Sequence, residues 1–148
     1  MNVIQQISTF VENCPGAFRE ILQVIRSNDI NIKALSIADT ADFGILRFIV
    51  TDPDILGKIL REAGFIVKKT PVLAITIGDK PGTLLTYVDK LSDADINIEY
   101  IYAFTTAAEN VAKVVVKVDD VERAMNILRN DKDIKEALQA NDTADFYW

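Results

Sequence analysis

Two short turns carry the residues best suited to bind a small ligand. Each has a polar residue, one further residue, then Pro-Gly, from Asn13 to Gly16 and from Asp79 to Gly82. Glycine lets a ligand approach the backbone. A helix beginning there offers unpaired N–H groups at its positive end, which can hold a carboxylate. An Asn amide both donates and accepts, which suits a zwitterion. The residues leave open the alternative that these are generic turns, with Asn or Asp bonded to its own backbone.

The second turn repeats the first as part of a duplicated unit. Six identical pairs keep one spacing of 66 residues: Pro15/Pro81, Gly16/Gly82, Asp29/Asp95, Ile30/Ile96, Asn31/Asn97 and Ile32/Ile98. A helical apolar stripe repeats at the same offset, as Phe18, Ile21, Leu22 and Ile25, then Leu84, Tyr87, Val88 and Leu91. The spacing grows to 68 by Leu60 and Leu128, which predicts two extra residues in the second hairpin. We therefore expect two domains, 1–70 and 71–148.

Both units follow the order β-α-β-β-α-β, which predicts an α+β fold of two ferredoxin-like units. In the first unit we expect strands at 4–11, 30–38, 43–50 and 65–69, and helices at about 16–28 and from 53. In the second we expect strands at 72–77, 96–104 and 110–118, and helices after Gly82 and after Asp120. The missing fourth strand is expected near Ile134.

Composition excludes several classes of function. The formal net charge of −6 disfavours nucleic acid as a partner. The single cysteine, Cys14, cannot form an intramolecular disulfide. No stretch predicts a signal peptide or a membrane span, so we expect a cytoplasmic protein without membrane contact.

The sequence predicts no catalytic residue, no metal and no cofactor. There is no histidine, so no Ser-His or Cys-His pair can form within one chain. Cys14 lies at a helix start, where a thiolate is favoured, but a small turn residue is the preferred interpretation. No zinc, calcium or phosphate-loop motif is present. The acidic pairs Asp52/Asp54 and Asp119/Asp120 are interpreted as helix caps.

The stretches "ENCPGAFREILQVIRSNDINI" and "IGDKPGTLLTYVDKLSDADINI" resemble the ACT domain, a small βαββαβ regulatory module. The resemblance implies a tandem ACT protein whose units lie side by side, sharing an antiparallel sheet, typically of eight strands, with helices on one face. It also implies that a free amino acid binds at the seam between units. The implied ligand-binding residues are Asn13, Cys14, Pro15, Gly16, Ala17, Asn31, Ile32, Asp79, Lys80, Pro81, Gly82, Thr83, Asn97 and Ile98.

Two departures from the family pattern affect the expected ligand. Serine-binding members carry a histidine two residues before the Asn, where this chain has Val11 and Ile77. Asp79 in place of an amide would attract an ammonium group and repel a carboxylate, so the two sites should differ.

The alternative function is a docking or oligomerisation module that kept the fold and lost its ligand. A homodimer and a regulated partner enzyme are the partners considered. The residues Tyr100, Tyr102 and Phe104, or the terminal "FYW", could form such a surface. Alternation favours placing the three aromatic residues in the core, facing the helices. An enzyme on this scaffold is the third and weakest hypothesis.

Overall fold

The protein is an α+β chain, and the strands in the part of the chain that the structure describes form one six-stranded sheet in the order β2-β3-β1-β4-β6-β5. The computed structural model describes residues 1–39, 42–105 and 110–140. The ladders β1–β3, β2–β3, β4–β6 and β5–β6 are all antiparallel. The eight strands implied by the resemblance become six within the described residues. The reason is that β1 and β4, of 11 and 12 residues, each contribute to both compact units of the chain.

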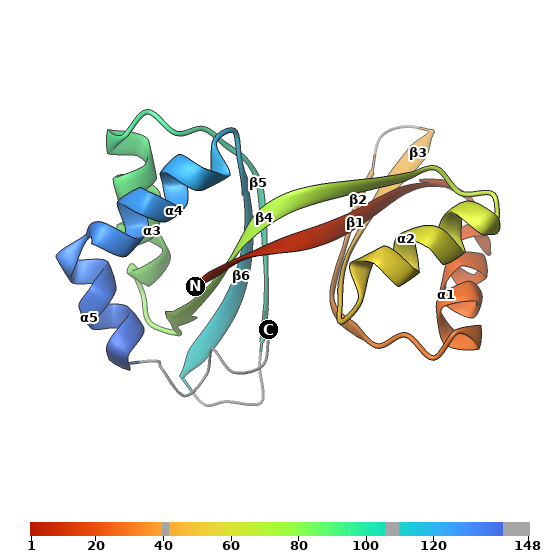
Figure 1. Ribbon diagram of the computed structural model, residues 1–148, viewed down its shortest axis with the longest axis horizontal. Coiled ribbons are helices and arrows are strands. Elements are labelled where there is room, and N and C mark those ends of the chain that lie inside the picture. Colours follow the sequence, from red (N-terminus) through yellow and green to blue (C-terminus); the bar gives the residue numbers. More distant parts are fainter. Residues whose placement is uncertain (40–41, 106–109, 141–148) are drawn as a thin grey trace. The chain divides into compact units, whose positions relative to one another are not determined.

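The first compact unit comprises Gln5–Thr70 and is called the N-terminal unit below. Its strands are the end of β1 (Asn2–Glu12), β2 (Ile32–Asp39), β3 (Phe43–Val50) and the start of β4 (Val67–Gly78). Helices α1 (Ala17–Ser27) and α2 (Pro53–Glu62) cover one face of these strands (Figure 1). Their apolar faces enclose a core of Ile7, Val11, Ile21, Ile25, Leu46, Phe48, Val50, Leu56 and Leu60.

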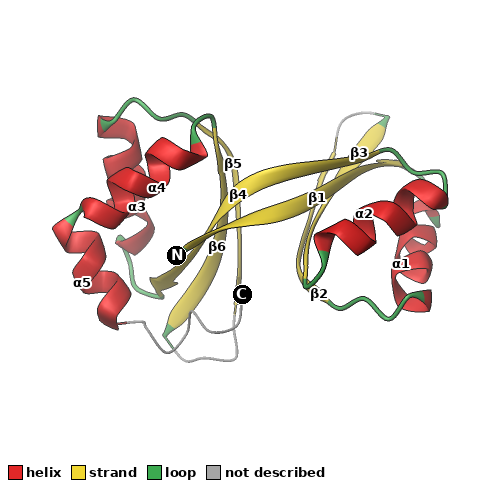
Figure 2. Ribbon diagram, viewed as in Figure 1, coloured by secondary structure: helices red, strands yellow, loops and turns green. Residues whose placement is uncertain are grey.

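The second compact unit comprises Met1–Ile4 and Pro71–Trp148 and is called the C-terminal unit. Besides the end of β4 it contains β5 (Ile98–Thr105) and β6 (Val111–Val118). Its helices are α3 (Thr83–Asp93), α4 (Val121–Asn130) and α5 (Lys132–Ala140), which gather on one face of the strands (Figure 2). The two units meet in sequence at Thr70/Pro71, where the sequence predicts a domain boundary, but residues 1–4 group with the C-terminal unit.

The predicted strand near Ile134 is wrong, because this segment forms helix α5. Asp131 starts the helix, since its Oδ1 accepts from the N–H groups of Asp133 and Ile134 at 3.0 and 3.1 Å. Ile134 is fully buried in the C-terminal core. The first residues of β1 occupy the sheet position beside β4, and Met1 packs into the same core. The chain start therefore supplies the strand that the sequence pattern assigns to the tail.

The separate strands predicted at 65–69 and 72–77 are one continuous strand, β4. Pro71 lies inside it and is exposed. On either side of Pro71 the strand joins different units, so the interruption suggested by its sequence is a change of unit and not a turn.

The prediction that Tyr100, Tyr102 and Phe104 face the helices is wrong. They pair with Lys117, Val115 and Lys113 of β6, whereas the β6 residues between these, Val114 and Val116, belong to the helix-facing core. The three aromatic residues therefore lie on the opposite face and are half-buried. The cause is a register shift between Ile98 and Tyr100, because one extra residue in a strand inverts the alternation that follows.

The remaining predicted elements agree with the structure to within a few residues, and the caps of α2 and α4 are confirmed. The side chain of Asp52 accepts from Ile55 N at 3.1 Å, and that of Asp120 from Arg123 N at 3.0 Å. The turn of the second hairpin, residues 106–109, and the terminal "FYW" lie outside the described residues. None of the helices described is both long and apolar enough to cross a membrane.

Candidate ligand sites at the two glycine turns

The two Pro-Gly turns have the same backbone geometry. In the N-terminal unit Asn13 N donates to Asp42 O at 3.2 Å, and Ala17 N donates to Cys14 O at 3.4 Å. In the C-terminal unit Asp79 N donates to Asn110 O at 2.8 Å, and Thr83 N donates to Lys80 O at 3.2 Å. Each polar residue thus ties its turn to the neighbouring strand hairpin through its main chain, which leaves its side chain for other contacts.

A left-handed glycine begins the helix at each turn. Gly16 has φ +92° and Gly82 has φ +85°, a conformation that strains any residue with a Cβ. Nothing lies within 4 Å of the place where a Cβ would stand on either residue. Steric room therefore exists for a ligand to reach the backbone at both turns.

Neither α1 nor α3 has a side-chain cap, in contrast to α2 and α4. In α1 the bond from Glu20 N to Gly16 O, of 3.1 Å, is the first of the helical series. The amides of Phe18 and Arg19 precede it and make no hydrogen bond with the described part of the chain. Free amides at a helix start carry the partial positive charge of the helix dipole. The two glycine-turn helices are thus open to an anionic group.

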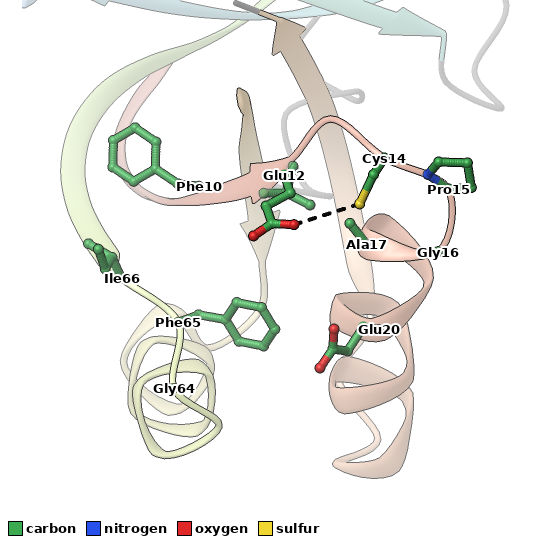
Figure 3. Close-up of a pocket in the computed structure, with 11 residues that line it drawn as sticks. Phe10, Glu12, Cys14, Pro15, Gly16, Ala17, Glu20, Gly64, Phe65 and Ile66 are labelled. Carbon is green, nitrogen blue, oxygen red and sulfur yellow. Dashed lines mark hydrogen bonds between the residues drawn. The ribbon is translucent and has the colours of Figure 1, made fainter. Parts of the chain in front are cut away.

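A pocket of about 490 Å³ adjoins the tip of α1 in the N-terminal unit. The predicted residues Cys14, Pro15, Gly16 and Ala17 line one side (Figure 3). The other lining residues come from the end of β1, from Glu20 of α1 and from Gly64–Ile66 between α2 and β4. Sequence reasoning missed this second group. Glu12 could have been noticed because it precedes the turn, but no pattern indicates that Gly64–Ile66 comes close to it.

The charged side chains that line this pocket are acidic. Glu12 and Glu20 line it, and no Lys or Arg is among its lining residues. Cys14 is a free, exposed thiol whose Sγ lies 3.8 Å from Glu12 Oε2. The pocket therefore combines a helix tip that attracts a carboxylate with side chains that attract an ammonium group. That combination matches the two charges of a free amino acid.

Asn31 lies at the other end of α1, away from the pocket at its tip. It lines a second pocket, of about 410 Å³, together with Arg26 and Asp29. At about 1.5 Å per residue, the 11 residues of α1 separate the two ends by roughly 16 Å. Ile32 packs against the N-terminal core. Asn13 and Asn31 of one unit are therefore not brought together by that unit itself.

In the C-terminal unit the predicted residues have the same arrangement. Asp79, Lys80, Pro81 and Gly82 are exposed at the turn, and Thr83 begins α3. Asn97 lies beyond the far end of α3, where its N–H donates to Asp119 Oδ1 at 3.2 Å and its carbonyl accepts from Asp119 N at 3.2 Å. Ile98 packs against the C-terminal core.

Most of the identities between the repeats have a structural cause. Asp29 and Asp95 both adopt φ +54° at the ends of α1 and α3, where the chain reverses. The isoleucines Ile30, Ile96, Ile32 and Ile98 pack in or against the two cores. Asn31 and Asn97 are exposed, and packing explains neither. They are the repeated residues most in need of a functional explanation.

No metal site is evident in residues 1–39, 42–105 and 110–140, since no three His, Cys, Asp or Glu residues cluster there.

Solved structures similar to this chain include protein BT0572 from Bacteroides thetaiotaomicron, with 39% identity and a TM-score of 0.81 over 86% of this chain and 87% of the other. The regulatory subunit of aspartate kinase from Thermus thermophilus has 16% identity and a TM-score of 0.62, over 87% of this chain and 96% of that one. Aspartate kinase from Clostridium acetobutylicum, described as an allosteric enzyme, has 16% identity and a TM-score of 0.51. That match covers 84% of this chain and 32% of the kinase.

Among curated proteins, none matches the sequence. The family model of the ACT domain pair matches residues 1–141. With its duplicated βαββαβ order and this match over nearly its whole length, the chain belongs to the ACT domain pair family.

Proposed function

We propose that this ACT domain pair is a non-catalytic regulatory protein that binds a free amino acid at its glycine turns. The observation that carries the proposal is a contrast within the chain. Helices α2 and α4 are capped by Asp52 and Asp120, whereas α1 and α3 begin uncapped beside an open glycine. A helix start without an internal partner is satisfied by water or by a ligand.

The ACT pair is a regulatory type of domain, and the structural relatives are consistent with this role. At 16% identity the aspartate kinase regulatory subunit supports a shared fold and no particular ligand. The Clostridium kinase shows the same fold as part of a longer allosteric enzyme. A regulated enzyme is accordingly the partner that we propose for this chain.

We further propose that Asn31 or Asn97 completes a site by reaching a turn on a facing unit. Their own turns lie at the opposite ends of α1 and α3, so a single unit cannot unite the two groups. Both side chains are exposed and available to a neighbour. A homodimer would supply such a facing unit.

Calorimetry with each of the twenty amino acids tests this function. We expect binding by at least one amino acid. Asn13→Ala or Asp79→Ala should weaken it at the affected turn, and Asn31→Ala or Asn97→Ala should weaken it at the facing one. Asn126→Ala, on the surface of α4, serves as a control that leaves binding unchanged. Silence of the wild-type chain towards all twenty would remove the sensing role.

The docking function is a second candidate because aromatic residues lie on the sheet faces that are directed away from the helices. Tyr100, Tyr102 and Phe104 lie on that face in the C-terminal unit. In the N-terminal unit Phe10 and Phe43 lie on the corresponding face, and each is 51% exposed. Such aromatic residues are enriched at protein interfaces.

Phe43→Ser distinguishes docking from sensing, because Phe43 is not among the residues that line the pocket beside α1. Under the docking function, sedimentation or capture of a partner enzyme changes in this variant and stays unchanged in Ile55→Ser, whose side chain is equally exposed on α2. Truncation after Asp142 tests the contribution of the terminal aromatic residues in the same assay. Unchanged association in all of them would leave docking without support.

A further inference from the structure

The sheet of the C-terminal unit has one face that the helices of this unit do not cover. We propose that residues 141–148, "NDTADFYW", fold back onto this face and cover it. These residues follow α5 and lie outside the described part of the chain, whereas the strands that would receive them lie inside it. In that position the segment occupies the aromatic surface that a docking partner would otherwise use. The proposal does not depend on which ligand the glycine turns bind.

Alternate residues of three neighbouring strands form the face, which is called the outer face below. Tyr102 of β5 pairs with Val115 of β6, and Val115 pairs with Ala74 of β4. Helices α3, α4 and α5 lie on the other face (Figure 2). The side chains of the outer face that matter here are Thr76, Tyr100, Tyr102, Phe104, Lys113 and Lys117.

The centre of the outer face is buried, although no helix of its own unit covers it. Lys113 is only 6% exposed, and Thr76 and Val115 are fully buried. The three aromatic residues of β5 on this face are half-buried. Lysine is almost never fully buried unless it is paired. A segment that brings carboxylates and aromatic rings would account for a buried cation among aromatic side chains.

The residues after α5 have the complementary chemistry. Asp142 and Asp145 are the only charged side chains among them, and the last three residues are aromatic. Their carboxylates are attracted to the two lysines of the outer face, of which Lys117 also has Glu99 Oε1 at 3.5 Å from its Nζ. Their rings can pack against Tyr100, Tyr102 and Phe104 in the offset or edge-to-face geometry that aromatic pairs prefer.

The segment is long enough for this contact. At about 3.3 Å per residue, eight extended residues reach up to roughly 26 Å. The strands β5, β6 and β4 are neighbours in the sheet, and at about 4.8 Å per strand they span roughly 10 Å. Because β5 stands at the end of the strand order, the segment can pass round this strand to reach the outer face.

The other repeat shows that the fold itself does not require this chemistry. In the N-terminal unit α2 is followed by β4 and not by an acidic aromatic segment. At the spacing of 66, the aromatic residues of β5 correspond to small residues, and at the spacing of 68 the two lysines correspond to isoleucines. These equivalents are Ala34, Ser36 and Ala38 on β2, and Ile45 and Ile49 on β3. The aromatic residues and cations therefore occur in the unit that is followed by the segment.

Trp148 is the only tryptophan of the chain, so its fluorescence reports directly on the segment. Acrylamide should quench it several-fold less in the full chain than in a free peptide of residues 141–148, because a docked ring is shielded from solvent. Tyr102→Ser and Asp145→Lys should each raise the quenching towards that of the peptide. Ile101→Ser, which changes the neighbouring residue on the other face, and Asp89→Lys, on the surface of α3, should leave it unchanged.

Three results would overturn the inference. The first is equal quenching of Trp148 in the full chain and in the peptide. The second is protection that survives both Tyr102→Ser and Asp145→Lys, which would place the segment elsewhere. The third is protection that appears only at high protein concentration, which would show docking between copies. Melting temperatures identify a variant that is unfolded, and if Tyr102→Ser is unfolded, Asp145→Lys alone decides.

Discussion

Lys90 of α3 lies 2.9 Å from the carboxylate of Asp131, the residue that also starts α5. Lys90 is 3.5 Å from Asp133 as well. These contacts link α3 to the helix that replaces the predicted last strand. The hydrogen bond from Lys90 is the main reason that the pKa of Asp131 is lowered from 3.8, and the bond to Asp131 raises the pKa of Lys90 above 10.5.

The first prediction concerns acid stability. Because the folded state lowers the pKa of Asp131, its ionised carboxylate stabilises the fold fully above pH 3.8. This stabilisation disappears as the pH falls through the lowered pKa. Asp131→Asn should therefore lower the melting temperature of the C-terminal unit at neutral pH. The difference from the wild type should shrink as pH falls below 3.8, which a series of melting curves can measure. Glu62→Gln, at an exposed pair of α2, should show almost no effect at any pH. A difference for Asp131→Asn that is constant with pH would contradict this account.

The second prediction concerns the left-handed ends of α1 and α3. Asp29 and Asp95 each have φ +54°, where glycine has no steric penalty. Asp29→Gly and Asp95→Gly should each stabilise the fold, by up to about 1 kcal/mol in urea unfolding. Asp89→Gly, at an exposed position inside α3, should instead destabilise it by about 1 kcal/mol. If all three variants lose stability alike, the aspartates have a role beyond closing the helix.

The third prediction compares two glycines of the N-terminal unit. A Cβ on Gly44 would lie 2.9 Å from Val11 Cγ1, whereas on Gly57 its nearest neighbour is the flexible end of Arg61 at 3.4 Å. Gly44→Ala should cost about 1–3 kcal/mol by overpacking. Gly57→Ala, in a helix, should gain roughly 0.5–1 kcal/mol. Chemical denaturation measures both, and equal signs would contradict the packing described.

The fourth prediction concerns the chain start. Met1 packs in the core of the C-terminal unit, and residues 1–4 group with it. Replacing Asn2, Val3 and Ile4 by Gly-Ser-Gly should raise hydrogen exchange in β4 after Pro71 and in β6. Exchange in α1 and β3, which belong to the N-terminal unit, should change less and serves as the internal reference. A uniform rise in both units would show that residues 2–4 are no more important to one unit than to the other.

Much of the fold could be predicted because the repeats are regular. The apolar stripe around Ile21 predicts α1, and its copy around Tyr87 predicts α3. The caps Asp52 and Asp120 predict where α2 and α4 begin. The family resemblance is confirmed by the match of the ACT pair model. The errors have local causes. The register shift after Ile98 exchanges the two faces of β5, and the amino-acid composition of the strand does not reveal it. Ile134 is an apolar residue that is compatible with a strand or a helix, so its position alone does not predict α5.

The candidate site could be predicted only in part. The glycine turns are visible in the sequence because proline, glycine and spacing coincide. The pocket wall at Phe65 and Ile66 depends on the path of the chain after α2, which local pattern does not reveal. The amino-acid ligand, the contribution of Asn31 and Asn97 across a seam, the dimer and the cytoplasmic location stay predictions.

Strand β4 restricts where the two repeats of this chain can differ in length. Since one unbroken strand serves both units, inserting a single residue near Pro71 would exchange inward and outward side chains in everything that follows it in the strand. A change of one residue in the length of this strand would therefore misplace its core side chains. They differ instead by an even step of two residues in the second hairpin, beyond which Leu60 and Leu128 again occupy equivalent buried positions.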